Sequence, residues 1–490
     1  MSMYAQWLIA ATFVAYLGLI LVIGVYAYLR TKNASDYFLG GRTLPPAVAA
    51  LSAGASDMSG WLLLGLPGAA YMSGLSSVWI AVGLFTGIVL SWTTMARRLR
   101  VYTYELDDAL TVPAYLHRRF NMGHPYLRTV CAFFILLFFL FYVASGLIAG
   151  GKLFETVFGW DYHWAVIAGA VAVISYTLFG GFLAVSWTDV FQGLLMSLAL
   201  VAVPLVVIVD EGGMATSWSL LHQQVPELMH WLRDSNGQAL GLVAILSALA
   251  WGLGYFGQPH ILARFQAVRS PDDVPVAASV AAIWSLVGFF GAICVGLFGH
   301  LELQQTLPDG ERVFMALVEV LFHPLVAGVL LAAILSAIMS TADSQLLVSS
   351  AALAEDIYHV WFGRQTSPAD MVKVGRWAVV GLALVAVWVA LDPGSRVLDV
   401  VSYAWAGLGA AFGPAVLISL FWSRMTGSGA IAGVVVGGVT VVVWRQLSGG
   451  IFDIYELLPA FVFSATAIVL VSIVTNCPTD VASRHRQLMG

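Results

Sequence analysis

Thirteen stretches of the chain are apolar over about the length that a helix needs to cross a lipid bilayer. A hydrocarbon core about 30 Å thick requires roughly 20 consecutive apolar residues. None of the stretches alternates between polar and apolar residues, as the strands of a transmembrane barrel would. The pattern predicts an all-α integral membrane protein with 13 transmembrane helices, at residues 6–29, 46–71, 74–96, 127–151, 163–181, 187–209, 239–259, 275–299, 322–352, 375–392, 397–422, 428–445 and 456–475.

The composition supports a chain whose solvent is lipid. Of its 490 residues, 60% are hydrophobic and only 10% are charged, whereas a soluble domain carries about 25% charged residues. The net charge of −5 is thinly spread and indicates no nucleic-acid partner. A Walker-type Gly-Lys-Ser/Thr loop, a His-Glu-x-x-His motif and a nucleophile elbow are absent from the sequence. We therefore expect neither ATP drive nor an enzyme, and no obligate protein partner is evident.

The basic residues predict an orientation. With the N-terminus outside, 17 of the 22 Lys and Arg residues fall in or beside inside loops, as expected for cytoplasmic segments. We therefore expect the N-terminus outside and residues 476–490 to form a cytoplasmic tail.

The second stretch is interrupted by small and polar residues between Gly54 and Gly60. Such residues weaken a helix, and a carboxylate such as Asp57 at midplane costs about 2.5–3.5 kcal/mol on insertion scales. One interpretation is a close helix contact with one buried acid. We favour the other, an unwound segment whose free carbonyls face a cation.

The seventh stretch is interrupted as well, by three glycines and a proline between Trp251 and Pro259. Trp251, Tyr255 and Gln258 stand at i, i+4 and i+7, so a helix would place them on one face. An interfacial aromatic belt could explain Tyr255 and His260, but it does not explain the glycines. We therefore expect this segment to border a cavity.

The two interruptions lie five spans apart, which suggests an inverted repeat. Five is an odd number, so a repeated unit of five helices must cross the membrane in the opposite direction the second time. The units would be residues 46–209 and 239–422 of a single membrane domain, 1–490. Residues 6–29 would be an additional leading helix, and 428–475 two additional helices at the C-terminal end.

The ninth stretch carries hydroxyl groups on one face. At 100° per residue, Ala337, Ser340 and Thr341 occupy one stripe of 100°. Sodium is a hard cation that takes oxygen ligands, as calcium and magnesium do. Ser and Thr also commonly bond their own backbone or join helices. Beside an unwound second span, we favour a cation site.

Three acids within the stretches are candidates for a link to an ion or a proton. Asp57 lies in the second span, Asp343 lies on the flank of the hydroxyl stripe, and Asp189 begins the sixth span near its cytoplasmic end. A structural role bonded to backbone is equally open for Asp57 and Asp189. No basic residue within the spans looks placed to clamp a carboxylate, so helix ends would have to meet one.

Four strings now carry a family resemblance. Ala-Ser-Asp57-Met-Ser-Gly-Trp61, the string Gly-Gly-Phe-Leu-Ala-Val-Ser-Trp-Thr-Asp189, Trp251-Gly-Leu-Gly-Tyr-Phe-Gly-Gln-Pro259-His and Met-Ser340-Thr341 resemble the sodium/solute symporter family. The resemblance extends over about residues 5 to 475, and the third string is closest to the proline branch. It implies a leucine-transporter-type fold of 5+5 helices in a bacterial cytoplasmic membrane, with a periplasmic N-terminus and a cytoplasmic C-terminus.

The resemblance also implies sites. A co-transported sodium ion would be held by the carbonyls of Ala55, Met58 and Ala337 and the hydroxyls of Ser340 and Thr341. Asp57 and Asp189 match acids tied to sodium-dependent function, whereas at Asp343 the proline branch has a small polar residue. With Gln258 added from the shared face, the expected substrate pocket comprises Ser59, Gly60, Trp61, Tyr142, Trp251, Tyr255, Gln258 and Pro259.

The expected function is therefore secondary active symport, in which inward sodium flow drives uptake of L-proline by alternating access. The alternatives are a symporter of the same fold for another small solute, such as a monocarboxylate, pantothenate, a sugar or another amino acid, and a transporter-like sensor.

Overall fold

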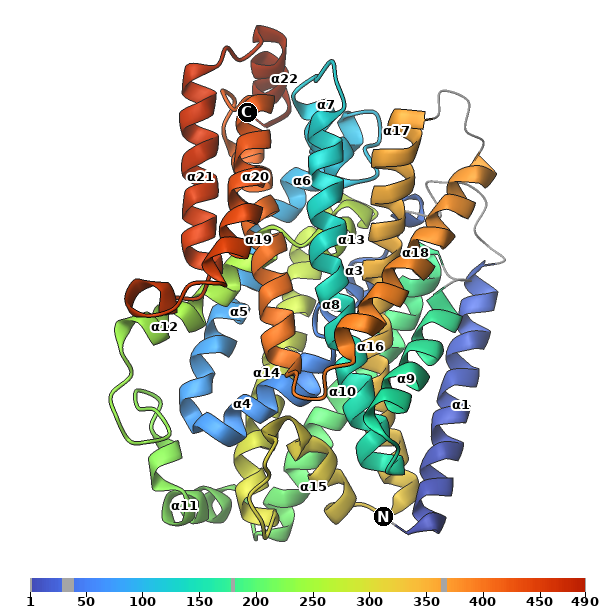
Figure 1. Cartoon of the computed structure of the whole chain (residues 1–490), viewed down its shortest axis with the longest axis vertical. Helices are drawn as coiled ribbons and strands as arrows, with labels where there is room; N and C mark the ends of the chain where they lie inside the picture. The colour runs from blue at the N-terminus through green and yellow to red at the C-terminus, as the bar shows by residue number, and fades with distance from the viewer. Residues whose placement is uncertain (1, 29–38, 178–180, 363–367, 490) are drawn as a thin grey trace.

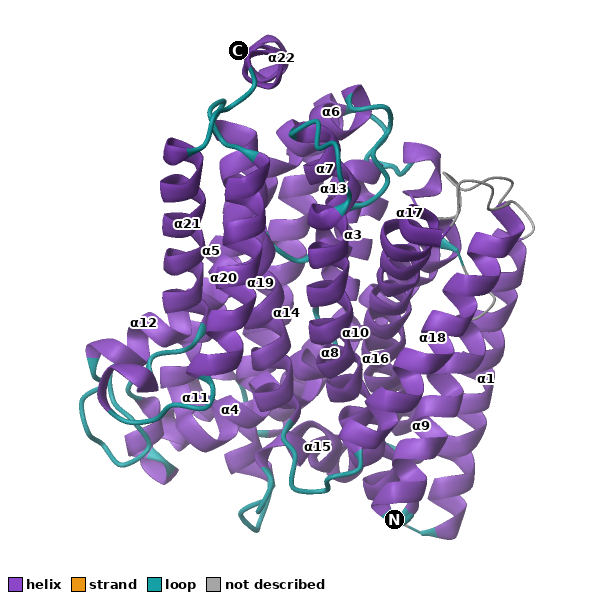
Figure 2. Cartoon of the chain, turned by 45° about the horizontal axis from the view of Figure 1, so that its top comes forward, coloured by secondary structure: helices purple, strands orange, loops and turns teal. Residues whose placement is uncertain are grey.

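The computed structural model describes residues 2–28, 39–177, 181–362 and 368–489. Within these ranges the chain is helical and contains no β-strand (Figure 2). Ten helices in the described part are long and apolar enough to cross a membrane, and a bent pair, Leu242–Phe256 with Pro259–Ala267, makes up to eleven. The expectation of an all-α membrane protein is confirmed.

Most of the predicted stretches coincide with single helices. These are α1 (Met3–Tyr28), α5 (Val78–Leu90), α8 (Tyr126–Phe158), α9 (Tyr162–Thr177), α10 (Phe182–Asp210), α14 (Val274–Glu302), α16 (Pro324–Ala351), α18 (Pro368–Ala390), α19 (Val397–Phe421), α20 (Gly427–Trp444) and α21 (Leu457–Val474). Shorter helices join them, namely α6 (Arg97–Glu105), α7 (Val112–Arg119), α11 (Met214–Gln224), α15 (Val313–Leu321), α17 (His359–Phe362) and α22 (Thr479–Met489).

The second predicted span is broken, over a shorter segment than expected. Helix α3 (Pro46–Asp57) continues through Gly54, and the non-helical residues are Met58 and Ser59. The chain then forms η2 (Trp61–Gly65), a π-helical turn, and α4 (Leu66–Ser73). Gly54 serves packing, because a Cβ there would lie 2.6 Å from the Trp284 ring. The expectation that Gly54 belongs to the unwound segment is therefore wrong.

The seventh predicted span is also broken. Helix α12 (Leu242–Ala250) tightens into the 3₁₀ segment η6 (Trp251–Phe256), and α13 (Pro259–Ala267) follows with Pro259 at its first position. The two parts meet at an angle of 47°. Proline tolerates the first helical position because its missing N–H has no partner there.

The two ends of the bundle differ in which connections they carry. The N-terminus lies at the end where α11 and α15 are found, and the C-terminus lies at the opposite end with α6, α7 and α22 (Figure 1, Figure 2). The helices at the C-terminal end include the basic run Arg97, Arg98 and Arg100, and also Arg118 and Arg119.

Packing between the two predicted five-span units is reciprocal. Helix α5 of the first unit packs on η6 of the second, and α14 of the second packs on α4 of the first. Likewise α10 packs on α16, and α19 packs on α8. Helices α3 and α13, which flank the two breaks, contact each other. This exchange is the pattern expected of two structurally related units.

The contact between α5 and η6 depends on glycine. A Cβ at Gly87 would lie 2.2 Å from the carbonyl oxygen of Gly252, and a Cβ at Gly252 would lie 2.2 Å from that of Gly83. The three nearest atoms at each position belong to backbone, so the clash cannot be relieved by a side chain moving aside.

We predict that Gly87→Ala destabilises the folded protein by about 1–3 kcal/mol, the usual result of overpacking. The measurement is the thermal transition of the detergent-solubilised protein. Gly18→Ala on α1 is the matched control, because a Cβ there meets no atom within 4 Å and alanine favours a helix. An equal transition temperature for Gly87→Ala and wild type would contradict the packing argument.

Candidate functional site

The break after α3 leaves backbone carbonyls that other helices satisfy. The Ala55 carbonyl accepts hydrogen bonds from the Ser340 hydroxyl at 2.7 Å and the Thr341 hydroxyl at 3.4 Å, both on α16. The Asp57 carbonyl accepts from the Tyr142 hydroxyl at 3.0 Å and the Trp61 indole at 3.1 Å. A helix end buried away from water needs such partners.

These contacts bring together four of the five residues expected to hold sodium. The Ser340 hydroxyl also lies 3.2 Å from the Ala337 carbonyl, so Ala55, Ala337, Ser340 and Thr341 present their oxygens in one place. Met58 is buried directly after the helix end, and its N–H donates to the Gly54 carbonyl at 2.8 Å. No hydrogen bond in the described part joins Met58 to α16. A group of carbonyl and hydroxyl oxygens suits a hard cation.

Asp57 connects the two breaks. Its Oδ2 atom accepts a short hydrogen bond from the Tyr255 hydroxyl on η6, while Oδ1 is buried without a hydrogen-bond partner in the described residues. Asp57 therefore lies two residues after Ala55, whose carbonyl meets Ser340 and Thr341, and its own side chain contacts the seventh span. A buried carboxylate oxygen without a partner is costly, which marks this position as a point where a ligand or ion would be stabilising.

Aromatic side chains surround this point. The ring of Trp61 lies 6.5 Å from that of Trp251, and Tyr255 and Tyr142 lie 4.9 Å and 6.5 Å from the ring of Trp405 on α19. Ser59 and Gly60 form the turn between α3 and η2. Six of the eight expected substrate residues are thus close to the break, namely Ser59, Gly60, Trp61, Tyr142, Trp251 and Tyr255.

Trp405 was missed by the sequence analysis and organises the seventh span. Its indole donates to the Trp251 carbonyl at 2.8 Å, and its own carbonyl accepts from the Gln258 amide at 3.1 Å. Gln258 therefore lies against α19, and the 3₁₀ geometry of η6 replaces the single helical face expected for these residues. The usable signal was a lone Trp in the small-residue stretch Ala404–Ala411, where only a close helix contact would be expected.

Pro259 lies apart from the aromatic group. It lines a separate cleft of about 30 Å³, together with Thr111 before α7, Ile135 of α8, Leu347 of α16 and Asp356 of the π-helical segment η9 (Ala352–Tyr358). Beside Asp57 and Tyr255 the cavity measures only about 10 Å³, the space of roughly one water molecule. In this conformation the cavity beside Asp57 and Tyr255 is too small to hold a solute.

Asp189 belongs to a buried network that the sequence analysis did not foresee. Its Oδ2 accepts from Arg264 at 3.1 Å and from the Ser52 hydroxyl at 2.6 Å. Arg264 also donates to Ser344 on α16 at 2.6 Å, and both charged side chains are 0% exposed. The network therefore joins α3, α10, α13 and α16.

Arg264 corrects one expectation. It is one of the 17 basic residues that the sequence places in or beside inside loops, whereas its side chain is buried within the bundle. The sequence does not reveal this because α13 follows a break whose direction it leaves open. Asp189, expected near the cytoplasmic end of the sixth span, is not exposed to water at a helix end; its side chain is wholly buried. Asp343 is buried on α16 beside Ser344, and both Asp343 and Asp189 interact electrostatically with Tyr16 of α1.

The end of the bundle near the N-terminus is held by a second network. Lys152 of α8 donates to Asp309 at 2.8 Å and to Glu311 at 2.6 Å. Glu311 in turn accepts from the backbone N–H groups of Val397 and Leu398 at 2.9 and 3.0 Å, the first residues of α19. A carboxylate at a helix N-terminus is stabilising. The segment before α15 that contains Asp309 and Glu311 is therefore held to both α8 and α19.

Comparison with known proteins gives the family. The sequence profile of the sodium:solute symporter family matches residues 37–437. The chain belongs to this family. It is a transporter of the symporter type and not an enzyme, in agreement with the sequence analysis.

Relatives of this symporter have been named by their solute. It is 49% identical to the sodium/proline symporter of Salmonella typhimurium over 475 residues, 96% of this chain and 93% of the relative. It is 48% identical to that of Escherichia coli, over the same shares of the two chains. The high-affinity proline transporter PutP of Bacillus subtilis is 46% identical, over 94% of this chain and 97% of the relative.

Solved structures show that the symporter shares a fold with more distant carriers. A Na⁺-coupled sialic acid symporter in a substrate-bound outward-open state matches with a TM-score of 0.78 at 20% identity, over 96% of this chain and 98% of that one. Mhp1, a nucleobase-cation-symport-1 family transporter in a closed conformation, matches with a TM-score of 0.56 at 15% identity, over 94% and 100%.

We predict that Arg264→Met destabilises the protein by about 3–5 kcal/mol, because it leaves Asp189 as a buried unpaired charge. Adding Asp189→Asn should restore most of that loss, since the double variant carries neither charge. Thermal transitions of the two single variants, the double variant and wild type give the coupling. Additive losses in the double variant would contradict a direct ion pair.

Proposed function

We propose that this symporter couples inward sodium flow to the uptake of L-proline by alternating access. The observation that carries the proposal is the meeting of the Ser340 and Thr341 hydroxyls with the Ala55 carbonyl at the break after α3. The relatives named sodium/proline symporters, at 46–49% identity over nearly the whole chain, support proline as the solute.

Sodium would bind where α16 meets the break. The ligands would be the carbonyl oxygens of Ala55, Met58 and Ala337 and the hydroxyl oxygens of Ser340 and Thr341. In the present structure the two hydroxyls donate to the Ala55 carbonyl. A cation takes lone pairs, so its arrival would turn the hydroxyl hydrogens away and make all these oxygens ligands.

Proline would bind beside the same break. Its pyrrolidine ring needs an apolar surface, which Trp61, Trp251, Tyr142 and Tyr255 supply. Its carboxylate needs N–H donors, and the turn at Ser59 and Gly60 that begins the second half of the span offers a helix N-terminus. Pro259 and Gln258 lie farther along the seventh span and would act through the position of α13.

Asp57 would transmit the effect of the ion to the solute. It lies two residues after Ala55, and its side chain accepts from Tyr255, whose ring packs against Trp405. If sodium orders the break, it would therefore also fix the aromatic side chains that we propose contact the proline ring. Asp189 would act at a distance, by holding Arg264 and Ser52 in place, and Asp343 is the remaining acid for a second ion or a proton.

The architecture we propose has 13 spans, with units at residues 46–209 and 239–422 related by an inverted repeat. The reciprocal packing of α5 with η6 and α14 with α4 supports it. The termini at opposite ends of the bundle are what an odd number of spans requires. The basic helices α6 and α7 lie at the C-terminal end, so we place that end in the cytoplasm and the protein in a bacterial cytoplasmic membrane.

The cycle requires the two sides to open in turn. Glu311, in the loop before α15, accepts from Lys152 of α8 and from the first residue of α19 at the outer end. These two contacts would have to break for solute to enter. One positive charge moving inward yields about 2.3 kcal/mol per 100 mV, or roughly fifty-fold accumulation of solute.

The function is tested by uptake of radiolabelled L-proline into proteoliposomes with an imposed inward sodium gradient. We expect sodium-stimulated accumulation that an excess of unlabelled L-proline abolishes. Unlabelled monocarboxylate, pantothenate, sugar and other amino acids are the competitors. Stimulation by sodium without competition by proline would assign another solute, and uptake that is indifferent to sodium would refute the proposal.

The sodium ligands are tested by Ser340→Ala and Thr341→Ala. Each should raise the sodium concentration needed for half-maximal uptake by roughly tenfold or more, since a lost oxygen ligand costs about as much as a hydrogen bond to a charge. Ser349→Ala is the control, a buried serine on the same helix whose hydroxyl has no hydrogen-bond partner in the described part. An equal sodium requirement in all three variants would remove α16 from the site.

A further inference from the structure

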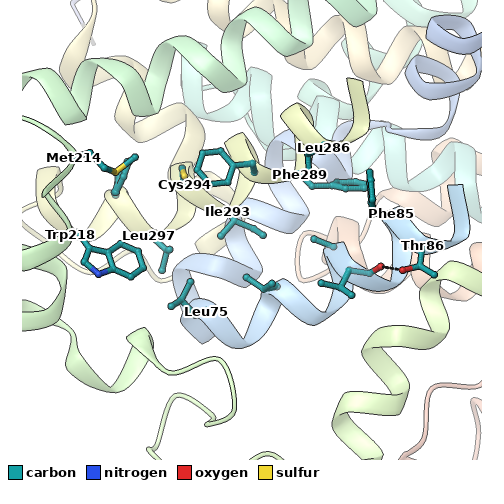
Figure 3. A pocket seen from close by; sticks show the side chains of 15 residues that line it. Leu75, Phe85, Thr86, Met214, Trp218, Leu286, Phe289, Ile293, Cys294 and Leu297 are labelled. Atoms are coloured by element: carbon teal, nitrogen blue, oxygen red, sulfur yellow. Dashed lines mark hydrogen bonds between the residues drawn. The ribbon is translucent and has the colours of Figure 1, made fainter. Parts of the chain in front are cut away.

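An apolar groove runs along the bundle between α5, α11 and α14. Its volume is about 360 Å³, and its lining includes Val82, Phe85, Trp218, Phe289, Phe290 and Leu297 (Figure 3). The hydroxyl of Thr86 in the groove donates to the Val82 carbonyl at 2.7 Å, so it offers no free donor. A ligand for this groove is therefore a hydrocarbon.

The exposed side of the groove is formed by two membrane-spanning helices, α5 and α14. Phe290 and Leu286 on α14 are 61% and 56% exposed, and Val82 on α5 is 41% exposed. Large apolar side chains that are exposed on membrane-spanning helices face the hydrocarbon of the bilayer. An acyl chain of a membrane lipid is therefore the occupant within reach.

Three acids lie a few residues from the side chains that line one end of the groove. Met214 and Trp218 line the end at α11 (Figure 3), which begins three residues after Glu211, and Leu297 lies five residues before Glu302. Glu302 interacts electrostatically with both Asp210 and Glu211. In the part of the chain that the structure describes, none of these three acids forms a salt bridge. Three carboxylates near the end of a lipid groove favour a headgroup with a cationic group that donates hydrogen bonds.

The groove also touches the candidate site. Phe289 lines it, and the ring of Phe289 lies 6.2 Å from that of Trp61. Trp61 in turn donates to the Asp57 carbonyl at the break. An acyl chain in the groove would support the wall formed by Phe289 and Trp61.

We propose that the groove binds an acyl chain of a phospholipid whose headgroup bears a primary ammonium, with Asp210, Glu211 and Glu302 around that ammonium. The acyl chain gives affinity through burial of apolar area, and the acids discriminate among headgroups. A choline headgroup carries the same charge but no N–H donor, so it lacks the charge-assisted hydrogen bonds.

The test is native mass spectrometry of the purified full chain with equal amounts of dioleoylphosphatidylethanolamine and dioleoylphosphatidylcholine. Wild type should retain the ethanolamine lipid about fivefold over the choline lipid, the scale of one interfacial charge interaction. The triple variant Asp210→Asn, Glu211→Gln, Glu302→Gln should bring that ratio close to one. Val82→Trp, which fills the groove, should reduce retention of both lipids.

Two variants serve as controls. Val14→Trp fills a second apolar groove, of about 490 Å³, formed by α1, Phe154, Phe158 and Trp160, and Asp453→Asn removes an acid from η10 (Gly450–Asp453). Both should keep the wild-type ratio of the ethanolamine lipid to the choline lipid. Equal retention of the two lipids by wild type, or undiminished retention by Val82→Trp, would overturn the proposal. The readout is lipid mass and not uptake, so it is independent of whether proline is the solute.

Discussion

A peptide carbonyl inside a membrane must find a hydrogen-bond donor within the protein, because the lipid offers none. Where α3 ends at Asp57, this requirement decides the surroundings. The carbonyls of Ala55 and Asp57 are met by hydroxyls and an indole from α16, α8 and η2. Of these groups, the Ser340 and Thr341 hydroxyls and the Ala55 carbonyl are the ones that we propose exchange a hydrogen bond for a cation. In that proposal, part of the set of atoms that stabilises the break also binds the ion.

The second break depends on the first through a few side chains. The Tyr255 hydroxyl reaches Asp57, and the ring of Tyr255 rests on Trp405, which also fixes both ends of the η6 region through Trp251 and Gln258. Glycines make this possible, since a Cβ at Gly254 would lie 1.9 Å from the Trp405 indole nitrogen. The site is thus assembled by close approach of backbone to large aromatic rings.

Much of this arrangement could be predicted from the sequence because it follows from local signals. Apolar length located the spans. Small and polar residues located the break in the second span, and three glycines and a proline located the break in the seventh. Helical periodicity placed Ser340 and Thr341 on one face. Contacts between distant segments leave no such signal. The residues around Arg264 in the sequence do not reveal whether its side chain faces solvent or pairs with Asp189. The sequence around Trp405 likewise does not distinguish it from any other buried tryptophan. Gly54 misled because a glycine needed for close packing against Trp284 is indistinguishable in sequence from one that unwinds a helix.

The buried pair of Arg264 and Asp189 has an electrical consequence. Its two charges are 3.1 Å apart, so to the transmembrane field they form a small dipole with no net charge. Displacing such a pair during a conformational change moves almost no charge across the membrane. Movement of the sodium ion that we propose beside the break after α3 would, in contrast, carry a net charge through the membrane field. Currents recorded during turnover would then report on the ion at that break and not on the Arg264–Asp189 pair.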